Sequence, residues 1–258
     1  FANHLEGTSL ASHPFIDTPD ESNTIILNLS NDSTFTNDEA YKLVIDKNKI
    51  VITARGEAGL FYGTQTILQM LDNGNGKTLK SITIEDTPRF PYRGMHLDVS
   101  RHFFDKEFVK KQLDAMAYFK MNRFHWHLTD GAGWRIEIKK YPRLTSFAAW
   151  RPFDNLQEWW VSGRTFCNQD DPRAVGGYYT QEDIREVVAY AAERHITIIP
   201  EIEMPGHSEE VLATYPELSC SGTPYVDADY CIGTEKTFEF LENVLLEVMD
   251  MFPSEYIH

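Results

Sequence analysis

The first third of the chain alternates apolar and polar residues in short runs that are typical of strands. Strand-like runs occur at residues 25–29, 41–54 and 81–85, and Asp46-Lys47-Asn48 splits the second run into a predicted hairpin. Residues 57–71 repeat their apolar positions at helical spacing, and the turn-forming residues 73–76 follow them. We therefore expect a small structural α+β domain over residues 1–88.

After the prolines at 88 and 91, the rhythm changes to strand and helix in alternation. Strands are predicted at residues 94–100, 122–129 and 196–203, helices at 105–120, 180–194 and 237–251, and a fourth strand begins at 254–258. Asp105 is a candidate N-cap, and Thr180 with Asp183 fits a capping box. This alternation indicates parallel β/α units. No GxGxxG follows the first of these strands, so a dinucleotide fold is disfavoured. We expect residues 89–258 to form the first half of a (β/α)8 TIM barrel.

Polar side chains follow the carboxyl ends of the three complete predicted strands. Asp98 with Arg101 follows the first, Asp130 the second, and Glu203 with His207 the third. A β/α barrel builds its active site at this edge, so these residues are the candidate functional group. Each has a simpler interpretation, since an Arg can close a salt bridge at the rim and an Asp can cap a turn.

His125 and His127 form a second pattern, because residues two apart on a strand share one face. Two such histidines could ligate zinc, and a metal-dependent barrel hydrolase is therefore a rival hypothesis. Their place inside the strand favours buried histidines that are hydrogen-bonded to neighbouring carboxylates.

Composition narrows the classes of partner. The 258 residues carry a net charge of −15, which disfavours nucleic acid and anionic lipid as partners. No apolar run approaches the roughly 20 residues of a membrane span, and no leader peptide is visible after Phe1. Cys220 and Cys231 could pair in an oxidising compartment, which would leave Cys167 single.

Four motifs in order resemble glycoside hydrolase family 20. They are PYRGMHLDVSRH at residues 91–102, FHWHLTD at 124–130, GWR at 133–135 and PEIEMPGH at 200–207. The resemblance implies a small α/β domain followed by a (β/α)8 barrel. It also implies a retaining exo-β-N-acetylhexosaminidase that removes terminal GlcNAc or GalNAc, with attack by the substrate's own acetamido oxygen. No metal or organic cofactor is implied.

The resemblance assigns roles position by position. Arg101 matches the arginine that binds the sugar hydroxyls at C3 and C4. His207 matches a residue that contacts the catalytic acid, and Asp130 matches the residue that orients His207. Glu203 and Trp134 match positions in or near the sugar pocket.

The family's catalytic Asp-Glu pair follows a Tyr-Ile-His-like run, and this sequence ends at Tyr256-Ile257-His258. We therefore expect this chain alone to be inactive and to need the C-terminal half of the barrel. The expected partners are β-linked glycans that end in N-acetylhexosamine, and the resemblance is compatible with a homodimer. Periplasmic, secreted or lysosomal localisation is expected, and a noncatalytic sugar-binding module is the remaining alternative.

Overall fold

The computed structural model describes residues 24–73 and 78–258. The chain divides into two compact units. One comprises Phe1–Arg93 with Asp114–Asn122, and the other comprises Gly94–Leu113 with Arg123–His258. The turn predicted at residues 73–76 lies largely outside the described residues.

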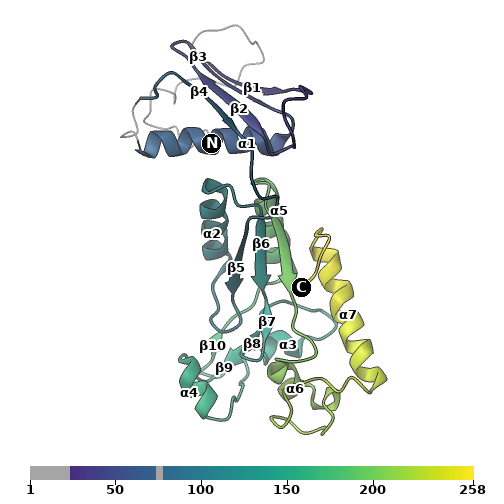
Figure 1. Ribbon diagram of the computed structural model, residues 1–258. Helices are drawn as coiled ribbons and strands as arrows, with labels where there is room; N and C mark the ends of the chain where they lie inside the picture. The colour runs from purple at the N-terminus through teal and green to yellow at the C-terminus, as the bar shows by residue number, and fades with distance from the viewer. Residues whose placement is uncertain (1–23, 74–77) are drawn as a thin grey trace. The chain divides into compact units, whose positions relative to one another are not determined.

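The first unit is a four-stranded sheet with one helix against it (Figure 1). Its strands lie in the order β1-β3-β2-β4, and only β1 and β3 are parallel. The predicted hairpin is present, because Asp46 accepts hydrogen bonds from the backbone of Asn48 and Lys49. The elements are β1 (Thr24–Leu29), β2 (Tyr41–Ile45), β3 (Lys49–Ala54), α1 (Glu57–Asn73) and β4 (Ile82–Asp86).

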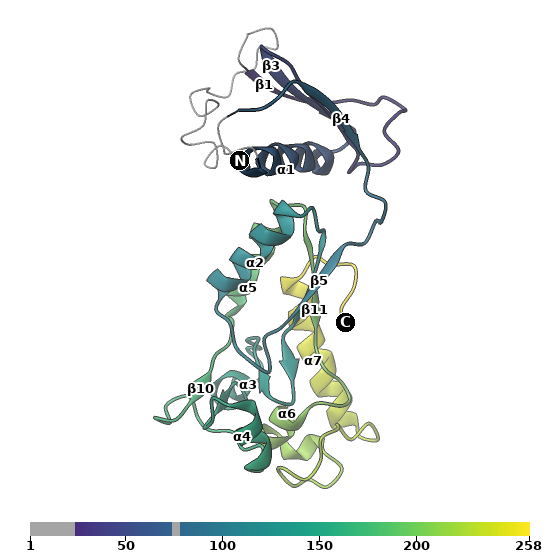
Figure 2. The same cartoon turned by 60° about the vertical axis from the view of Figure 1, so that its left-hand side comes forward.

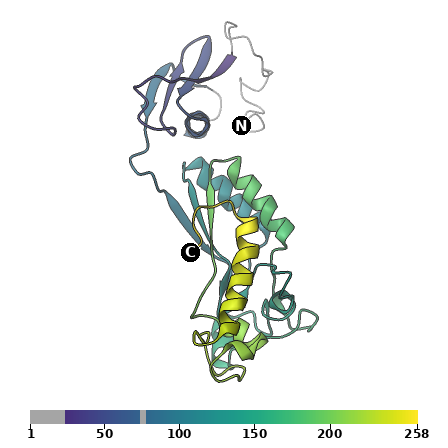
Figure 3. The same ribbon diagram turned by 90° about the vertical axis from the view of Figure 1, so that its right-hand side faces the viewer.

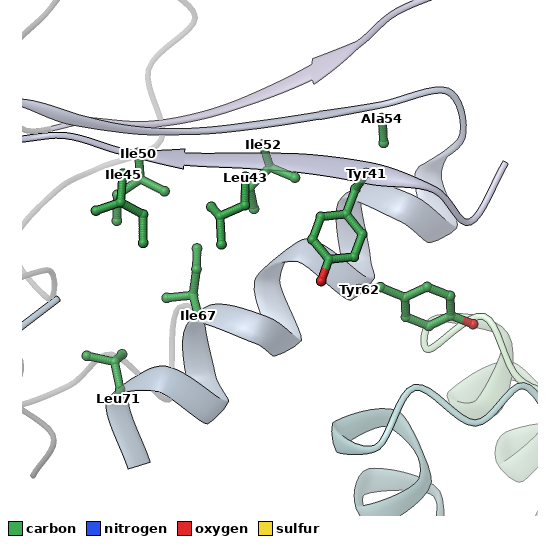
Figure 4. Packing of buried hydrophobic residues seen from close by; sticks show 9 residues of the cluster. All are labelled: Tyr41, Leu43, Ile45, Ile50, Ile52, Ala54, Tyr62, Ile67 and Leu71. Atoms are coloured by element: carbon green, nitrogen blue, oxygen red, sulfur yellow. The ribbon is translucent and has the colours of Figure 1, made fainter. Parts of the chain in front are cut away.

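The core of this unit lies between the sheet and α1. Figure 4 shows the inward side chains of β2 and β3 pointing toward Ile67 and Leu71 of the helix. Leu43, Ile52 and Ile67 are completely buried. The alternating apolar positions of the strands and the helical spacing of α1 therefore meet on one shared apolar interface.

The second unit is built on three parallel strands in the order β11-β6-β5, each followed by a helix. In Figure 3 these three helices lie to one side of the strands. The elements are β5 (Gly94–Asp98), α2 (Lys106–Tyr118), β6 (Arg123–His127), α5 (Gln181–Ala192), β11 (Thr197–Glu201) and α7 (Glu235–Met251). Only the part of α2 up to Leu113 belongs to this unit.

The register of this sheet places the ends of the three strands side by side. Asp98 pairs with His127, and His127 pairs with Glu201. Because the strands are parallel, the polar residues that follow them are brought to one edge. The fold-class prediction is confirmed, with three strands of the expected partial barrel present as β/α units.

The helix starts agree with the predicted caps. Asp105 accepts a hydrogen bond from the Phe108 backbone, and Thr180 and Asp183 form the full capping box. The predicted fourth strand is not formed as a named strand. His258 instead exchanges backbone hydrogen bonds with Pro200 and Ile202 beside β11, so its pairing is limited to one residue.

Short elements gather where β5, β6 and β11 end, as Figure 1 shows. These elements are only two to six residues long, which is too short to show a period in the sequence. They are β7 (Thr129–Asp130), β8 (Gly133–Trp134), α3 (Arg143–Ser146), β9 (Trp150–Arg151), α4 (Leu156–Val161), β10 (Val175–Gly176), α6 (Glu209–Thr214) and a 3-10 turn at Pro216–Leu218.

Cys220 and Cys231 form a disulfide, and Cys167 is free and buried. Across the described parts of the chain, every helix lacks the length or the apolar character needed to cross a bilayer.

Candidate functional site

Arg101 lies just past the end of β5 and is fixed there by Asp98. The Asp98 carboxylate accepts hydrogen bonds from the backbone N–H groups of Ser100 and Arg101. Its other oxygen lies 2.8 Å from Nη1 of Arg101. The carboxylate therefore closes the turn and also orients the guanidinium, whose side chain remains 36% exposed.

Asp130 lies at the centre of the polar cluster. Its Oδ2 atom is 2.7 Å from Nη2 of Arg101, 3.0 Å from Nδ1 of His207 and 3.3 Å from Nε2 of His127. The Asp130 side chain is only 5% exposed. One carboxylate oxygen therefore joins three groups that come from three different strand ends (Figure 2 shows β5 and β11 of this sheet).

The backbone around Asp130 is held by hydrogen bonds from Ser100. The buried Ser100 hydroxyl lies within hydrogen-bond distance of the carbonyls of Asp130 and Gly133. Gly131 follows Asp130, and a Cβ atom at that position would lie 2.1 Å from Oε2 of Glu209. A larger residue at this position would displace the Glu209 carboxylate, which packs directly against the turn.

The contacts of Asp130 favour its charged form. Burial alone would raise the carboxyl pKa, but the hydrogen bonds to His127 and His207 and the charge of Arg101 lower the pKa below its ordinary value. The hydrogen bond to Asp130 and its negative charge raise the pKa of His207. Asp130 thus stabilises the protonated form of the His207 imidazole.

His207 sits on an exposed turn with a positive φ of 53°, an uncommon backbone conformation for a non-glycine residue. The turn is braced by the disulfide-closed loop, because Ser208 donates to the Ala228 carbonyl and Tyr230 donates to the Pro205 carbonyl. The imidazole is 62% exposed. His207 can therefore contact Asp130 through Nδ1 while the exposed part of its ring remains able to contact another group.

Glu203 joins the same cluster through His127, whose Nε2 lies 3.4 Å from Oε1 of Glu203. Burial and the negative charge of Asp130 raise the pKa of the Glu203 carboxyl. The Glu203 backbone N–H donates to the Thr129 hydroxyl, which fixes the chain beyond β11.

Trp134 lies beneath the cluster and not in its exposed wall. Its side chain belongs to a residue that is 1% exposed, and its indole N–H donates to the Ile136 carbonyl. This placement fits a supporting role under the site better than direct contact with a sugar, and the substrate-binding role stays a prediction.

The histidines of β6 lie close to Glu201, the last residue of the neighbouring strand β11. His125 Nε2 lies 2.5 Å from Oε2 of Glu201, and His258 Nδ1 lies 3.3 Å from Oε1. The histidines lie close to carboxylates, as expected, but Nε2 of His125 and both ring nitrogens of His127 lack a hydrogen-bond partner of normal geometry. Within residues 24–73 and 78–258, three groups have donor atoms close enough to hold a divalent cation: His96 with His127 and Glu201, His125 with Glu201 and His258, and His127 with Asp130 and Glu203.

A hollow of about 210 Å3 opens beside Arg101, Asp130 and His207. The Gly131–Ala132 turn lines it as well. Its remaining wall comes from α4 and from the first residue of α6, namely Leu156, Trp159, Trp160 and Glu209. The strand-end residues thus border a space that can hold a small ligand.

Sequence reasoning missed Arg135, although the GWR motif contains it. Arg135 is fully buried, and its guanidinium donates to the backbone carbonyls of Val99, Ser100, Ala149 and Gly177. Burial and the nearby charge of Arg151 lower the pKa of Arg135 to about 9. A buried arginine that ties four chain segments leaves no periodic signal. Its proximity to Trp134 in the motif was the one available hint.

Comparisons with known proteins assign the chain to a family. Residues 90–258 match the model described as glycosyl hydrolase family 20, catalytic domain, and residues 2–87 match its domain 2. The chain is 43% identical over 237 residues to a beta-hexosaminidase of Porphyromonas gingivalis. This alignment covers 86% of this chain and 28% of that protein. It is also 43% identical over 229 residues to a beta-hexosaminidase of Vibrio furnissii, covering 85% and 36%.

Solved structures give the same result. The exo beta-N-acetylglucosaminidase of Vibrio harveyi in complex with N-acetylglucosamine aligns with a TM-score of 0.76 at 36% identity, covering 91% of this chain and 37% of that chain. The beta-N-acetylhexosaminidase of Bacteroides fragilis aligns with a TM-score of 0.76 at 38% identity, covering 91% and 44%. The chain thus spans less than half the length of each of these four relatives.

Proposed function

We propose, from the premise that this chain belongs to glycosyl hydrolase family 20, that the protein is an exo-acting β-N-acetylhexosaminidase. It would release terminal GlcNAc or GalNAc from β-linked glycans. The observation that supports this most directly is the joining of Arg101 and His207 through Oδ2 of Asp130, at 2.7 and 3.0 Å. The names of the relatives, which include a chitobiase and several hexosaminidases, support the same substrate class.

Each side chain of the cluster has a task in this reaction. Arg101 offers a planar fork of donors, which suits two vicinal hydroxyls of a terminal sugar. His207 carries a proton and points one face to solvent, where it can hydrogen-bond the general acid. Asp130 orients His207 and keeps it charged, and this tunes the proton affinity of that acid.

The acetamido oxygen of the substrate would act as the nucleophile in a retaining, substrate-assisted reaction. The cluster described above contains no residue that we assign as the general acid. The proposal takes the acid, and the carboxylate that orients the acetamido group, to belong to the complete natural polypeptide. We also propose a secreted, periplasmic or lysosomal location, which the Cys220–Cys231 disulfide supports.

A substrate panel tests the proposal. The complete natural polypeptide should hydrolyse p-nitrophenyl β-GlcNAc and β-GalNAc, and it should leave p-nitrophenyl β-glucoside essentially intact, because glucose lacks the acetamido nucleophile. Progressive fluorination of the acetamido group should lower kcat steeply. Equal rates on the glucoside and the GlcNAc glycoside would contradict the substrate-assisted mechanism. Binding of GlcNAc without turnover of any glycoside would favour the noncatalytic module.

The rival metal-dependent hydrolase was predicted from His125 and His127. Among the described residues these two histidines fall in different candidate ligand groups, and His125 lies with Glu201 and His258. Elemental analysis of the purified polypeptide decides between the two functions, since the proposed reaction needs no metal. We expect activity to survive prolonged EDTA treatment. Stoichiometric zinc whose removal abolishes hydrolysis would favour the rival.

A further inference from the structure

The hollow beside the polar cluster contains an aromatic wall that the reaction at the terminal sugar does not use. We infer that Trp160 forms a subsite for the sugar ring on the leaving-group side of the scissile bond. The inference rests on the proposed function and assigns the part of the site that selects an oligosaccharide over a simple glycoside.

Two adjacent tryptophans of α4 have opposite environments. Trp159 is 2% exposed and packs with Ala132, Phe166 and Ala213, whereas Trp160 is 54% exposed. Both line the hollow. Trp159 therefore anchors the helix, and Trp160 presents a large apolar ring to a ligand. The C–H face of a pyranose ring is the kind of flat, weakly polar surface that packs against an indole.

Trp160 is held in place before any ligand binds. The Arg164 guanidinium lies over its ring at 3.7 Å from the centroid, and Arg164 also forms a 2.6 Å ion pair with Glu209. Glu209 in turn packs against Gly131, the residue after Asp130. The aromatic wall is thus tied to the turn that carries Asp130, which fixes its distance from the cluster.

The position of the wall indicates which sugar it would contact. Arg101 and His207 both line the hollow. Trp160 is tied to its His207 side, because Arg164 lies over the Trp160 ring and pairs with Glu209, two residues after His207. His207 is the residue proposed to contact the general acid. That acid delivers its proton to the oxygen of the leaving group. A sugar ring in the space next to His207 therefore belongs to the departing part of the glycan, while Arg101 holds the terminal sugar.

The test measures kcat/KM of the complete natural polypeptide on two substrates whose leaving groups are not aromatic. N,N'-diacetylchitobiose fills the proposed subsite, and methyl β-N-acetylglucosaminide leaves it empty. We expect Trp160→Ala to lower kcat/KM on the disaccharide about tenfold while changing it less than about twofold on the methyl glycoside. Trp160→Phe retains a ring and should recover most of the loss.

Val161→Ala is the matched control, because Val161 is the next residue of α4, is 70% exposed and does not line the hollow. It should leave both substrates unchanged. An unchanged disaccharide rate in Trp160→Ala would overturn the subsite, and so would an equal loss on both substrates. If the wild-type protein cleaves neither substrate, the proposed function fails, which is a separate result from failure of the subsite.

Discussion

At the scale of single residues, Asp130 explains most of what the cluster can do. Its Oδ2 atom lies close to side-chain nitrogen atoms of Arg101, His207 and His127. Its Oδ1 atom accepts a hydrogen bond from the backbone N–H of Gly131. A buried carboxylate with this many donors is charged and fixed. Its exposed partner His207 is the residue through which that charge can reach a reacting group.

Replacing Asp130 by Asn tests this arrangement, because the amide keeps the size of the side chain and removes its charge. We expect kcat on p-nitrophenyl β-GlcNAc to fall by about 10²-fold. Without the carboxylate, the pKa of His207 should return toward its ordinary value, and the alkaline limb of the pH profile should move to lower pH.

Asp171→Asn is the control, since Asp171 is also a carboxylate paired with an arginine, Arg173, but does not line the hollow. It should leave the pH profile unmoved. An Asp130→Asn profile that overlays the wild-type profile would show that Asp130 does not act through His207.

The same pair predicts a pH-dependent stability. The pKa of His207 is raised in the folded protein, so its stabilising contribution is complete below the ordinary value of 6.5 and is lost as pH rises through the raised pKa. The thermal midpoint of His207→Gln should therefore fall further below wild type at about pH 5.5 than at about pH 9. A gap of constant size at both pH values would contradict the ion pair.

At the scale of elements, the parallel strands bring the polar residues to one edge, as the sequence indicated. The connections between strands also contribute residues to the site. The strand spacing alone placed Asp98, Asp130 and Glu203 at one edge, because parallel strands end together. It could not place α4 or α6, whose 6 residues each are too few for a helical period. Trp160 and Glu209 reach the hollow only through those short helices and a long-range ion pair, which no local pattern encodes.

Arg135 is the residue that ties these connections to the strand ends. Arg135→Met should lower the free energy of unfolding by about 2–4 kcal/mol, because four buried carbonyls lose their donor. Chemical denaturation measures the change. Arg55→Met, which removes only the exposed ion pair with Asp38, should cost less than about 1 kcal/mol. Equal effects of the two substitutions would argue against the bracing role.

The disulfide-closed loop supports the His207 turn through the carbonyl of Ala228 and the N–H of Tyr230. Changing Cys220 and Cys231 together to Ser should lower stability by about 3 kcal/mol, the typical effect of cross-linking a short loop. It should also lower kcat, because the turn loses its brace. The Cys167→Ser variant leaves the disulfide intact and serves as the control. Full activity in the double variant would show that the His207 turn keeps its conformation without the disulfide.

At the scale of the whole molecule, two sequence patterns determined how much could be predicted. Alternating apolar runs predicted the small sheet with α1, and the alternation of strands and helices predicted the parallel β/α units of the second part. The net charge of −15 agrees with a neutral glycan as the expected substrate class. The contacts of Trp134 could not be predicted, because its burial depends on segments that pack over it from far along the chain.

We propose that the Arg101 guanidinium, fixed by Asp98 and Asp130, binds the terminal sugar of a β-linked glycan. Hydrolysis of p-nitrophenyl β-GlcNAc by the complete natural polypeptide with Arg101→Ala tests it most directly. We predict that kcat/KM falls by about 10²-fold or more, since a charged fork of donors to two hydroxyls is lost. A variant that retains the wild-type kcat/KM would contradict the claim.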